Sequence, residues 1–242
     1  MERNNLNFVL VHGGWHGAWV WERLVPYLAQ AGYNVFTPDL TGLGEKVKLA
    51  NPDIGLNTHI RDILGILDDK NLYNVLLVGH SYGGMVITGV ADKAAERIAK
   101  LIYLDAHVPK DGQSFGDIVG PQIMNMMRQV TKATGQGWLV PTPPPEHFGI
   151  TLEADIAFVK SKLVPQPIKT FEEPVHLTNP AAFTVPRTYI YLNKPPLGSF
   201  DGFAKMARSS KDWGYYEMAT GHDAMILEPQ ELAELFIKIA NE

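Results

Sequence analysis

Short apolar segments alternate with amphipathic segments over the first 110 residues of the chain. Four apolar runs have the length of buried strands, at residues 7–11, 34–37, 75–78 and 100–104. Between them, apolar residues recur every three or four positions, which predicts amphipathic helices at 19–31, 59–69 and 85–97. Strands that alternate with helices indicate a mainly parallel sheet with helices on its faces.

This alternation stops after residue 110 and returns at residue 187. The segment between is rich in methionine and proline, including Met124, Met126, Met127 and the run Pro143–Pro145. Strands are predicted again at 187–192 and 214–218, and helices at 200–209 and 229–240. We therefore predict an α/β fold with about six strands, a core of residues 1–110 and 187–242, and an insertion of residues 111–186.

Ser81 is the candidate nucleophile. The third predicted strand leads into Gly79-His80-Ser81-Tyr82-Gly83, and a predicted helix follows. A serine between two glycines at a strand-to-helix turn is typical of a nucleophile elbow, in which a sharp backbone turn exposes the hydroxyl group. The alternative is a glycine-rich turn whose serine only caps the helix.

His222 is the candidate base, because a serine hydroxyl needs a base and a third group that orients it. It follows a short strand, and ligands gather where parallel strands end. The backbone N–H groups of Gly14 and Tyr82 are predicted to hold the oxyanion. Of the other histidines, His12 is predicted to brace the glycine loop and His80 to pack inside. The remaining ones are interpreted as solvated or pocket residues: His16, His59, His147 and His176.

Four motifs together resemble the α/β-hydrolase superfamily: residues 8–21, 38–44 and 79–84, and Gly221-His222-Asp223. The resemblance is to the branch of plant methylesterases, hydroxynitrile lyases and small bacterial carboxylesterases, including pyrethroid hydrolases. It implies a helical cap at 111–186 that closes over the site and shapes substrate choice. The lyases have threonine and lysine where this chain has Gly13 and Asp223, and this difference favours an esterase.

The acidic member of the triad is where the sequence departs from the family. The family usually places its aspartate after the strand that here is 187–192, but residues 193–197 contain no carboxylate. Asp105 ends the strand at 100–104, where one subgroup of haloalkane dehalogenases keeps its acid. Asp201 is the alternative, although it stands where an aspartate simply favours a helix N-terminus. We prefer Asp105, because it ends a central strand next to the nucleophile strand.

Composition limits the partners of the protein. A net charge of -5 and a pI near 5.9 argue against nucleic acid or an anionic membrane as partner. The chain has no cysteine, which excludes disulfides and thiolate sites. No apolar run has the length of a membrane span, and the N-terminus lacks the pattern of a signal peptide, so a cytoplasmic location is expected.

These observations predict a carboxylesterase that works through an acyl-enzyme on small-molecule esters, without cofactor or metal. Medium-sized apolar esters are expected, with Trp15 and His107 in the substrate pocket. A ligand receptor with a hydrolase fold, and a lyase or C–C bond-cleaving enzyme with the same triad, are the alternatives. The sequence leaves the oligomeric state open, with a homodimer as one option.

Overall fold

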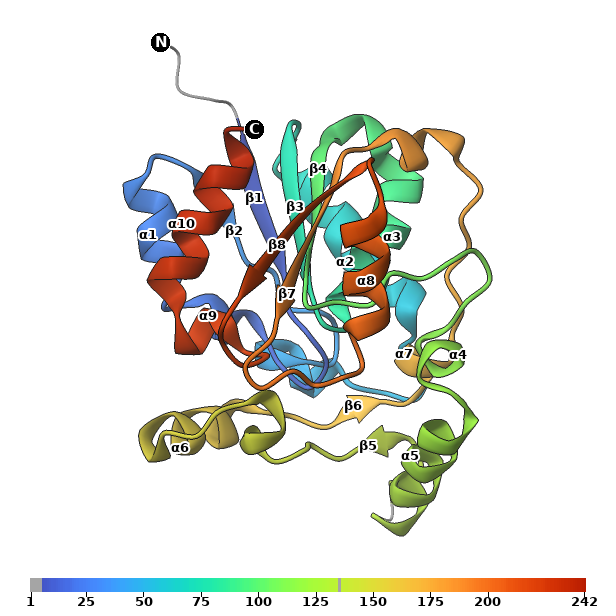
Figure 1. Cartoon of the computed structure of the whole chain (residues 1–242). Helices are drawn as coiled ribbons and strands as arrows, with labels where there is room; N and C mark the ends of the chain where they lie inside the picture. Colours follow the sequence, from blue (N-terminus) through green and yellow to red (C-terminus); the bar gives the residue numbers. More distant parts are fainter. Residues whose placement is uncertain (1–5, 135) are drawn as a thin grey trace.

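The computed structural model describes residues 6–134 and 136–242. Its centre is a six-stranded sheet in the order β2-β1-β3-β4-β7-β8, and every neighbouring pair is parallel (Figure 1). The strands are β1 (Asn7–Val11), β2 (Asn34–Phe36), β3 (Val75–His80), β4 (Ile98–Leu104), β7 (Arg187–Leu192) and β8 (Trp213–Met218). The predicted parallel sheet is therefore confirmed.

Helices cover both faces of this sheet (Figure 1). One face carries α1 (Val25–Gln30), α9 (Ala224–Leu227) and α10 (Pro229–Ala240), and the other carries α2 (Leu56–Asp69), α3 (Gly83–Ala94) and α8 (Asp201–Ser209). Successive side chains of a strand point to opposite faces, so Phe8 and Leu10 pack in one core layer and Val9 and Val11 in the other. The central strands β1 and β3 are covered on both faces, which explains why they are almost entirely apolar and buried.

The helix predicted at 19–31 is wrong in extent. A short 3-10 turn (Ala18–Trp21) comes first, and α1 begins only at Val25. Pro26 stands in the first turn of α1, because it has no N–H to bond to a carbonyl four residues earlier. Three other predicted helices are present with shifted ends: α2 starts at Leu56, α3 ends at Ala94 before a 3-10 turn (Ala95–Arg97), and α8 starts at Asp201. The helix α10 has the predicted bounds, 229–240.

The part of the segment 111–186 from α4 (Phe115–Val119) to α7 (Lys169–Glu172) lies across the lower end of the sheet in Figure 1, where the strands finish, and the chain after α7 runs back up the side of the molecule to β7. The segment contains α4, α5 (Pro121–Ala133), α6 (Glu153–Lys162), α7 and two 3-10 turns (Pro145–Phe148 and Pro180–Thr184), with a two-stranded antiparallel sheet of β5 (Leu139–Val140) and β6 (Gln166–Pro167). Its later part packs on the main body, because Phe171, Val175 and Val185 belong to the same core layer as α2 and α3. Within the described residues, no helix combines the length and the apolar character needed to cross a membrane.

Candidate active site

Ser81 stands on a sharp turn between β3 and α3. Its φ of 54° lies in the left-handed region, which is strained for a serine. Only glycine fits at the two flanking positions. A Cβ on Gly79 would lie 2.6 Å from the Gly83 carbonyl oxygen, and a Cβ on Gly83 would lie 2.8 Å from the Val11 carbonyl oxygen. The turn presents the Ser81 hydroxyl at the end of the sheet, as the sequence predicts.

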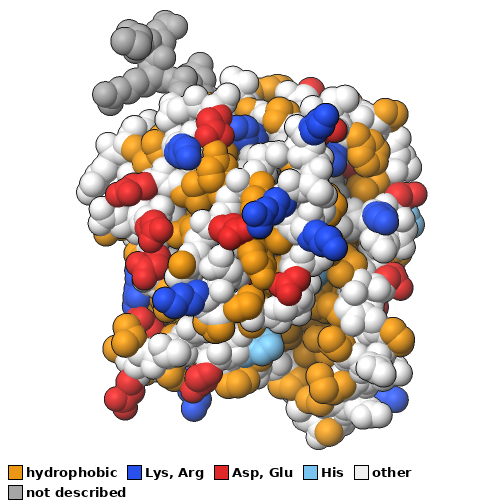
Figure 2. All heavy atoms as spheres, in the orientation of Figure 1, with side chains coloured by type: hydrophobic (Ala, Val, Ile, Leu, Met, Phe, Trp, Pro, Cys, Tyr) orange, Lys and Arg blue, Asp and Glu red, His pale blue; other side chains and the backbone are white. Residues whose placement is uncertain are grey.

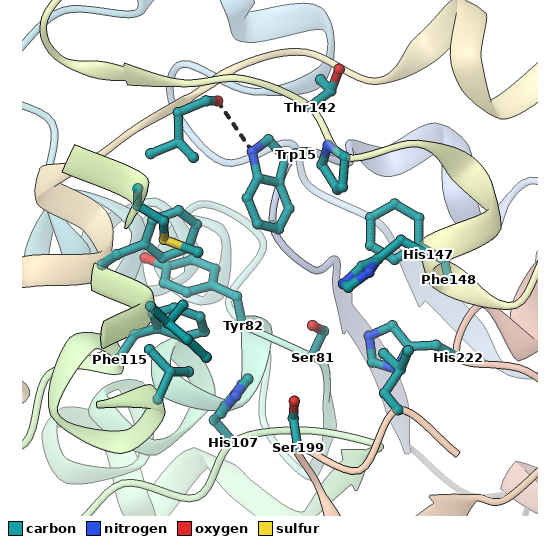
Figure 3. A pocket seen from close by; sticks show the side chains of 18 of the residues that line it. Trp15, Ser81, Tyr82, His107, Phe115, Thr142, His147, Phe148, Ser199 and His222 are labelled. Atoms are coloured by element: carbon teal, nitrogen blue, oxygen red, sulfur yellow. Dashed lines mark hydrogen bonds between the residues drawn. The ribbon is translucent and has the colours of Figure 1, made fainter. Parts of the chain in front are cut away.

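His222 lies in the loop between β8 and α9, and its ring faces the same cavity as Ser81 (Figure 3). Nδ1 lies 2.7 Å from a carboxylate oxygen of Asp105. Phe200 stacks on one side of the imidazole, with ring centroids 5.0 Å apart and an interplanar angle of 12°. This burial lowers the pKa of His222, so the ring stays neutral and available as a base at neutral pH.

Asp105 and Asp201 have different surroundings. Asp105 is buried at the end of β4 with a φ of 42°, and it also accepts a hydrogen bond from the Leu192 N–H at 3.4 Å. Burial raises the pKa of this carboxyl well above its usual range, and the hydrogen bond from the Leu192 N–H opposes that effect in part. Asp201 is exposed at the start of α8 and accepts a hydrogen bond from the Tyr191 hydroxyl at 2.5 Å. The structure therefore brings Asp105, and not Asp201, against His222.

The N–H groups of Gly14 and Tyr82 donate to no other residue within the part of the chain that the structure describes. Both residues line the cavity beside Ser81. The loop that carries Gly14 is held from two sides, because its carbonyl accepts from His16 Nδ1 at 2.6 Å and the next N–H, of Trp15, donates to Gln166 at 2.7 Å. Two donors with fixed positions near a serine are the arrangement that stabilises an oxyanion.

A buried ion pair between His16 and Asp223 lies next to His222, and the sequence did not predict it. His16 Nε2 is 3.1 Å from Asp223 Oδ2, and both side chains are almost fully buried. Because the two ring nitrogens of His16 face only oxygen acceptors, both carry a proton. Burial alone would lower the pKa of His16, but the Asp223 carboxylate outweighs it and raises that pKa; His16 in turn lowers the pKa of Asp223 against the effect of burial. The pair joins the Gly14 loop to the His222 loop.

The interpretation of His16 and His59 as solvated or pocket residues is wrong. His59 is buried under the cavity, where it hydrogen-bonds the Tyr82 hydroxyl and the Thr41 carbonyl, each at 3.0 Å. His147 does line the cavity, and His176 is exposed. Sequence spacing could not reveal the pairing of His16 with Asp223, since these two residues are 207 positions apart in the chain.

The two structural histidines behave as predicted. His80 is fully buried, and its Nε2 lies 3.0 Å from the His222 carbonyl oxygen, so its N–H holds the backbone of the loop that carries His222. His12 bonds the Gly13 carbonyl through Nδ1 at 2.9 Å and accepts from the Leu40 N–H at 3.1 Å. Both side chains therefore fix loops around the site.

The cavity above Ser81 has a volume of about 470 Å³ and apolar walls. Trp15 forms part of the wall; its indole N–H donates to the Val140 carbonyl at 3.2 Å (Figure 3), and its ring contacts Phe171. None of the described residues that line the cavity is Asp, Glu, Lys or Arg. Hydrophobic side chains also gather at the lower right of the face in Figure 2, where α5 adjoins the main body. The cavity thus suits an uncharged organic molecule.

No group of three or more His, Asp or Glu side chains within residues 6–134 and 136–242 is arranged to hold a metal ion. The polar side chains that line the cavity include the parts expected of nucleophilic catalysis: a serine and a histidine, with a carboxylate behind the histidine.

Comparison with known proteins identifies the fold family. The model of the alpha/beta hydrolase family matches residues 8–235. The chain is 38% identical to a carbendazim hydrolyzing esterase of Nocardioides sp. (strain SG-4G), over 94% of this chain and 97% of that protein. It is 31% identical to the pFDCC methylesterase MES16 of Arabidopsis thaliana, over 79% of this chain and 78% of that protein. These relatives support the prediction of an ester-cleaving enzyme.

Among solved structures, an extracellular α/β-hydrolase from a Paenibacillus species superposes with a TM-score of 0.84 and 27% identity, covering 96% of this chain and 98% of that chain. It is described as sharing structural and functional homology with Tobacco Salicylic Acid Binding Protein 2. The sheet, the turn at Ser81 and these similarities agree: the chain belongs to the alpha/beta hydrolase family.

Proposed function

We propose that the protein is a serine carboxylesterase that hydrolyses neutral, medium-sized apolar esters through an acyl-enzyme. The observation that carries the proposal is the 2.7 Å hydrogen bond between His222 and Asp105, made by a histidine that faces the same cavity as Ser81. A nucleophile, a base and a group that orients the base are the three parts that acyl transfer requires.

In the proposed mechanism, Ser81 Oγ attacks the ester carbonyl carbon and His222 Nε2 takes the hydroxyl proton. Asp105 keeps the Nδ1–H of His222 in place and stabilises the imidazolium. The N–H groups of Gly14 and Tyr82 hold the oxyanion, and each such donor is worth about 3 kcal/mol of barrier. The imidazolium then protonates the leaving alkoxide, and a water molecule activated by His222 releases the acid from Ser81.

The segment 111–186 acts as the cap in this proposal. Phe115, Met127 and Phe171, from α4, α5 and α7, line the cavity together with residues of the core. Methionine side chains adapt to differently shaped ligands, which suits a roof over a substrate pocket. The relative named methylesterase favours a small alcohol group for the ester of this chain as well.

A panel of p-nitrophenyl esters of increasing acyl length tests this function. The protein is expected to hydrolyse the short and medium esters, and Ser81→Ala should lower kcat by about 10⁴-fold or more while leaving the thermal unfolding temperature unchanged. Ser161→Ala is the matched control, because Ser161 lies on α6 and its exposed hydroxyl donates to the Phe158 carbonyl. Full turnover by Ser81→Ala would refute the proposal.

A ligand receptor is the second candidate, and the described homology of the Paenibacillus hydrolase to a salicylic acid binding protein favours it. The cavity of this chain offers no lysine or arginine among its described lining residues, so a carboxylate ligand would find no counter-charge there. Calorimetric titration with salicylate distinguishes the two functions. Saturable binding without hydrolysis of any ester would favour the receptor.

A further inference from the structure

His107 is a polar residue in a wall of aromatic rings. Its ring centroid lies 4.9 Å from that of Phe115, 4.8 Å from that of Phe200 and 5.9 Å from that of Phe203. The side chain is 3% exposed and lines the cavity, and Figure 3 shows it on the floor, pointing toward Ser81. Its Nδ1 is buried and has no hydrogen-bond partner within the residues that the structure describes.

Packing alone does not explain a histidine here. A buried polar atom without a partner lowers the stability of the fold, and a phenylalanine of similar size would avoid that cost among three other phenylalanines. Burial lowers the pKa of His107 to about 3, so the ring is neutral at pH 7. A neutral imidazole carries one donor and one acceptor nitrogen, and it does not attract ions.

The position of this ring relative to the nucleophile is fixed by the backbone. The His107 N–H donates to the Ser81 carbonyl at 3.1 Å. The His107 carbonyl lies so close to the first turn of α3 that a Cβ on Gly84 would stand 2.1 Å from its oxygen. Because the backbone of His107 is fixed against the turn at Ser81, its ring can contact one defined position of a substrate that is bound at Ser81.

We infer that His107 determines specificity by forming a hydrogen bond to a heteroatom of the substrate. This inference rests on the proposed esterase function and narrows its substrate class to neutral esters whose acyl or aromatic part carries a nitrogen or oxygen besides the ester group. The apolar walls hold the carbon skeleton, and the heteroatom bonds Nε2 of His107, because the unpartnered Nδ1 is sealed from the cavity. An analogue that lacks the heteroatom leaves Nε2 without a partner in the complex and is therefore a poorer substrate.

Two matched substrates test the inference: p-nitrophenyl benzoate and p-nitrophenyl pyridine-3-carboxylate, which differ by one ring nitrogen. His107→Phe should lower kcat/KM for the pyridine ester about 10- to 100-fold relative to the benzoate, as expected for one lost hydrogen bond. His107→Gln, which keeps a donor and an acceptor, should restore part of the preference. His147→Phe is the control, since His147 lines the same cavity but is exposed; it should change both substrates by one factor.

Each outcome has a separate meaning. An equal loss of kcat/KM on both substrates would make His107 a packing residue. Unchanged kcat/KM values on both substrates in His107→Phe would show that its ring makes no contact with the substrate. Either result overturns the inference while leaving the esterase intact. If the unmodified protein hydrolyses neither ester nor p-nitrophenyl acetate, the proposed function itself fails. Thermal unfolding of both His107 variants shows whether the fold is retained.

Discussion

Asp105 and Asp201 can be told apart by removing one charge at a time. Asp105→Asn should lower kcat by about 10⁴-fold, because the amide leaves His222 in the wrong tautomer and does not stabilise the imidazolium. Asparagine tolerates the left-handed backbone, so the φ of 42° at this position need not change. Asp201→Asn should retain nearly full kcat, since its carboxylate bonds Tyr191 and not His222. A dead Asp201→Asn with an active Asp105→Asn would reverse the assignment.

The ion pair of His16 and Asp223 should stabilise the fold only while both side chains are present. Asp223→Ala leaves a buried imidazole without its carboxylate and should lower the free energy of unfolding by about 3 to 5 kcal/mol. The double variant His16→Gln/Asp223→Asn removes both charges, and its loss of unfolding free energy should be clearly smaller than that of Asp223→Ala. Urea unfolding of the unmodified protein, of Asp223→Ala, of His16→Gln, of Asp223→Asn and of the double variant measures the losses and the coupling. A loss in the double variant equal to the sum of the losses in His16→Gln and Asp223→Asn would show that the two side chains are not coupled.

The same pair predicts how stability depends on pH. The pKa of His16 is raised by folding, so its contribution is complete below about 6.5 and disappears as the pH rises through the raised pKa. The pKa of Asp223 is lowered, so its contribution is complete above 3.8 and disappears as the pH falls through the lowered pKa. The difference in unfolding free energy between the protein and the double variant should therefore be largest between these limits. A difference that grows at alkaline pH would contradict an ionised pair.

At the scale of elements, the nucleophile elbow depends on glycine for space. Gly79→Ala would place a Cβ 2.6 Å from the Gly83 carbonyl oxygen, and because the Cβ is fixed to the strand and the oxygen belongs to the backbone of the helix, the strand and helix must separate. We expect a loss of about 3 kcal/mol or more in unfolding free energy. Gly65→Ala in α2 is the matched control: its Cβ meets no atom within 4 Å, and it should stabilise the helix by about 0.5–1 kcal/mol. Chemical denaturation measures the unfolding free energy of both variants. An equal change in Gly79→Ala and Gly65→Ala would contradict this account of the turn.

Elements with local signals could be predicted from the sequence. Apolar runs between glycine-rich turns predicted all six strands of the main sheet, and the pattern around Ser81 predicted both the turn and its residues. The helix at 19–31 was overestimated because the apolar periodicity continues past Pro26, which cannot donate the hydrogen bond that an α-helix needs there. His16 and Asp223 carry no local signal, since their pairing depends on how two distant loops meet.

For the whole molecule, the cavity sets the range of substrates. A volume of about 470 Å³ bounded by the segment 111–186 accommodates a medium-sized ester and not three long acyl chains. Soluble aryl esters should therefore be hydrolysed faster than emulsified triolein. Titration of released acid at constant pH measures both rates under one condition, and faster turnover of triolein would contradict the proposed cap.

The central claim is that Ser81, activated by His222, forms a covalent intermediate. Diethyl p-nitrophenyl phosphate tests it directly, because Ser81 Oγ would attack phosphorus, p-nitrophenolate would leave, and the diethylphosphoryl group would remain on the enzyme. We expect one equivalent of p-nitrophenolate per chain, loss of ester hydrolysis, and a mass increase on the peptide that contains Ser81. Labelling at another residue, or full ester hydrolysis by the labelled protein, would contradict the account.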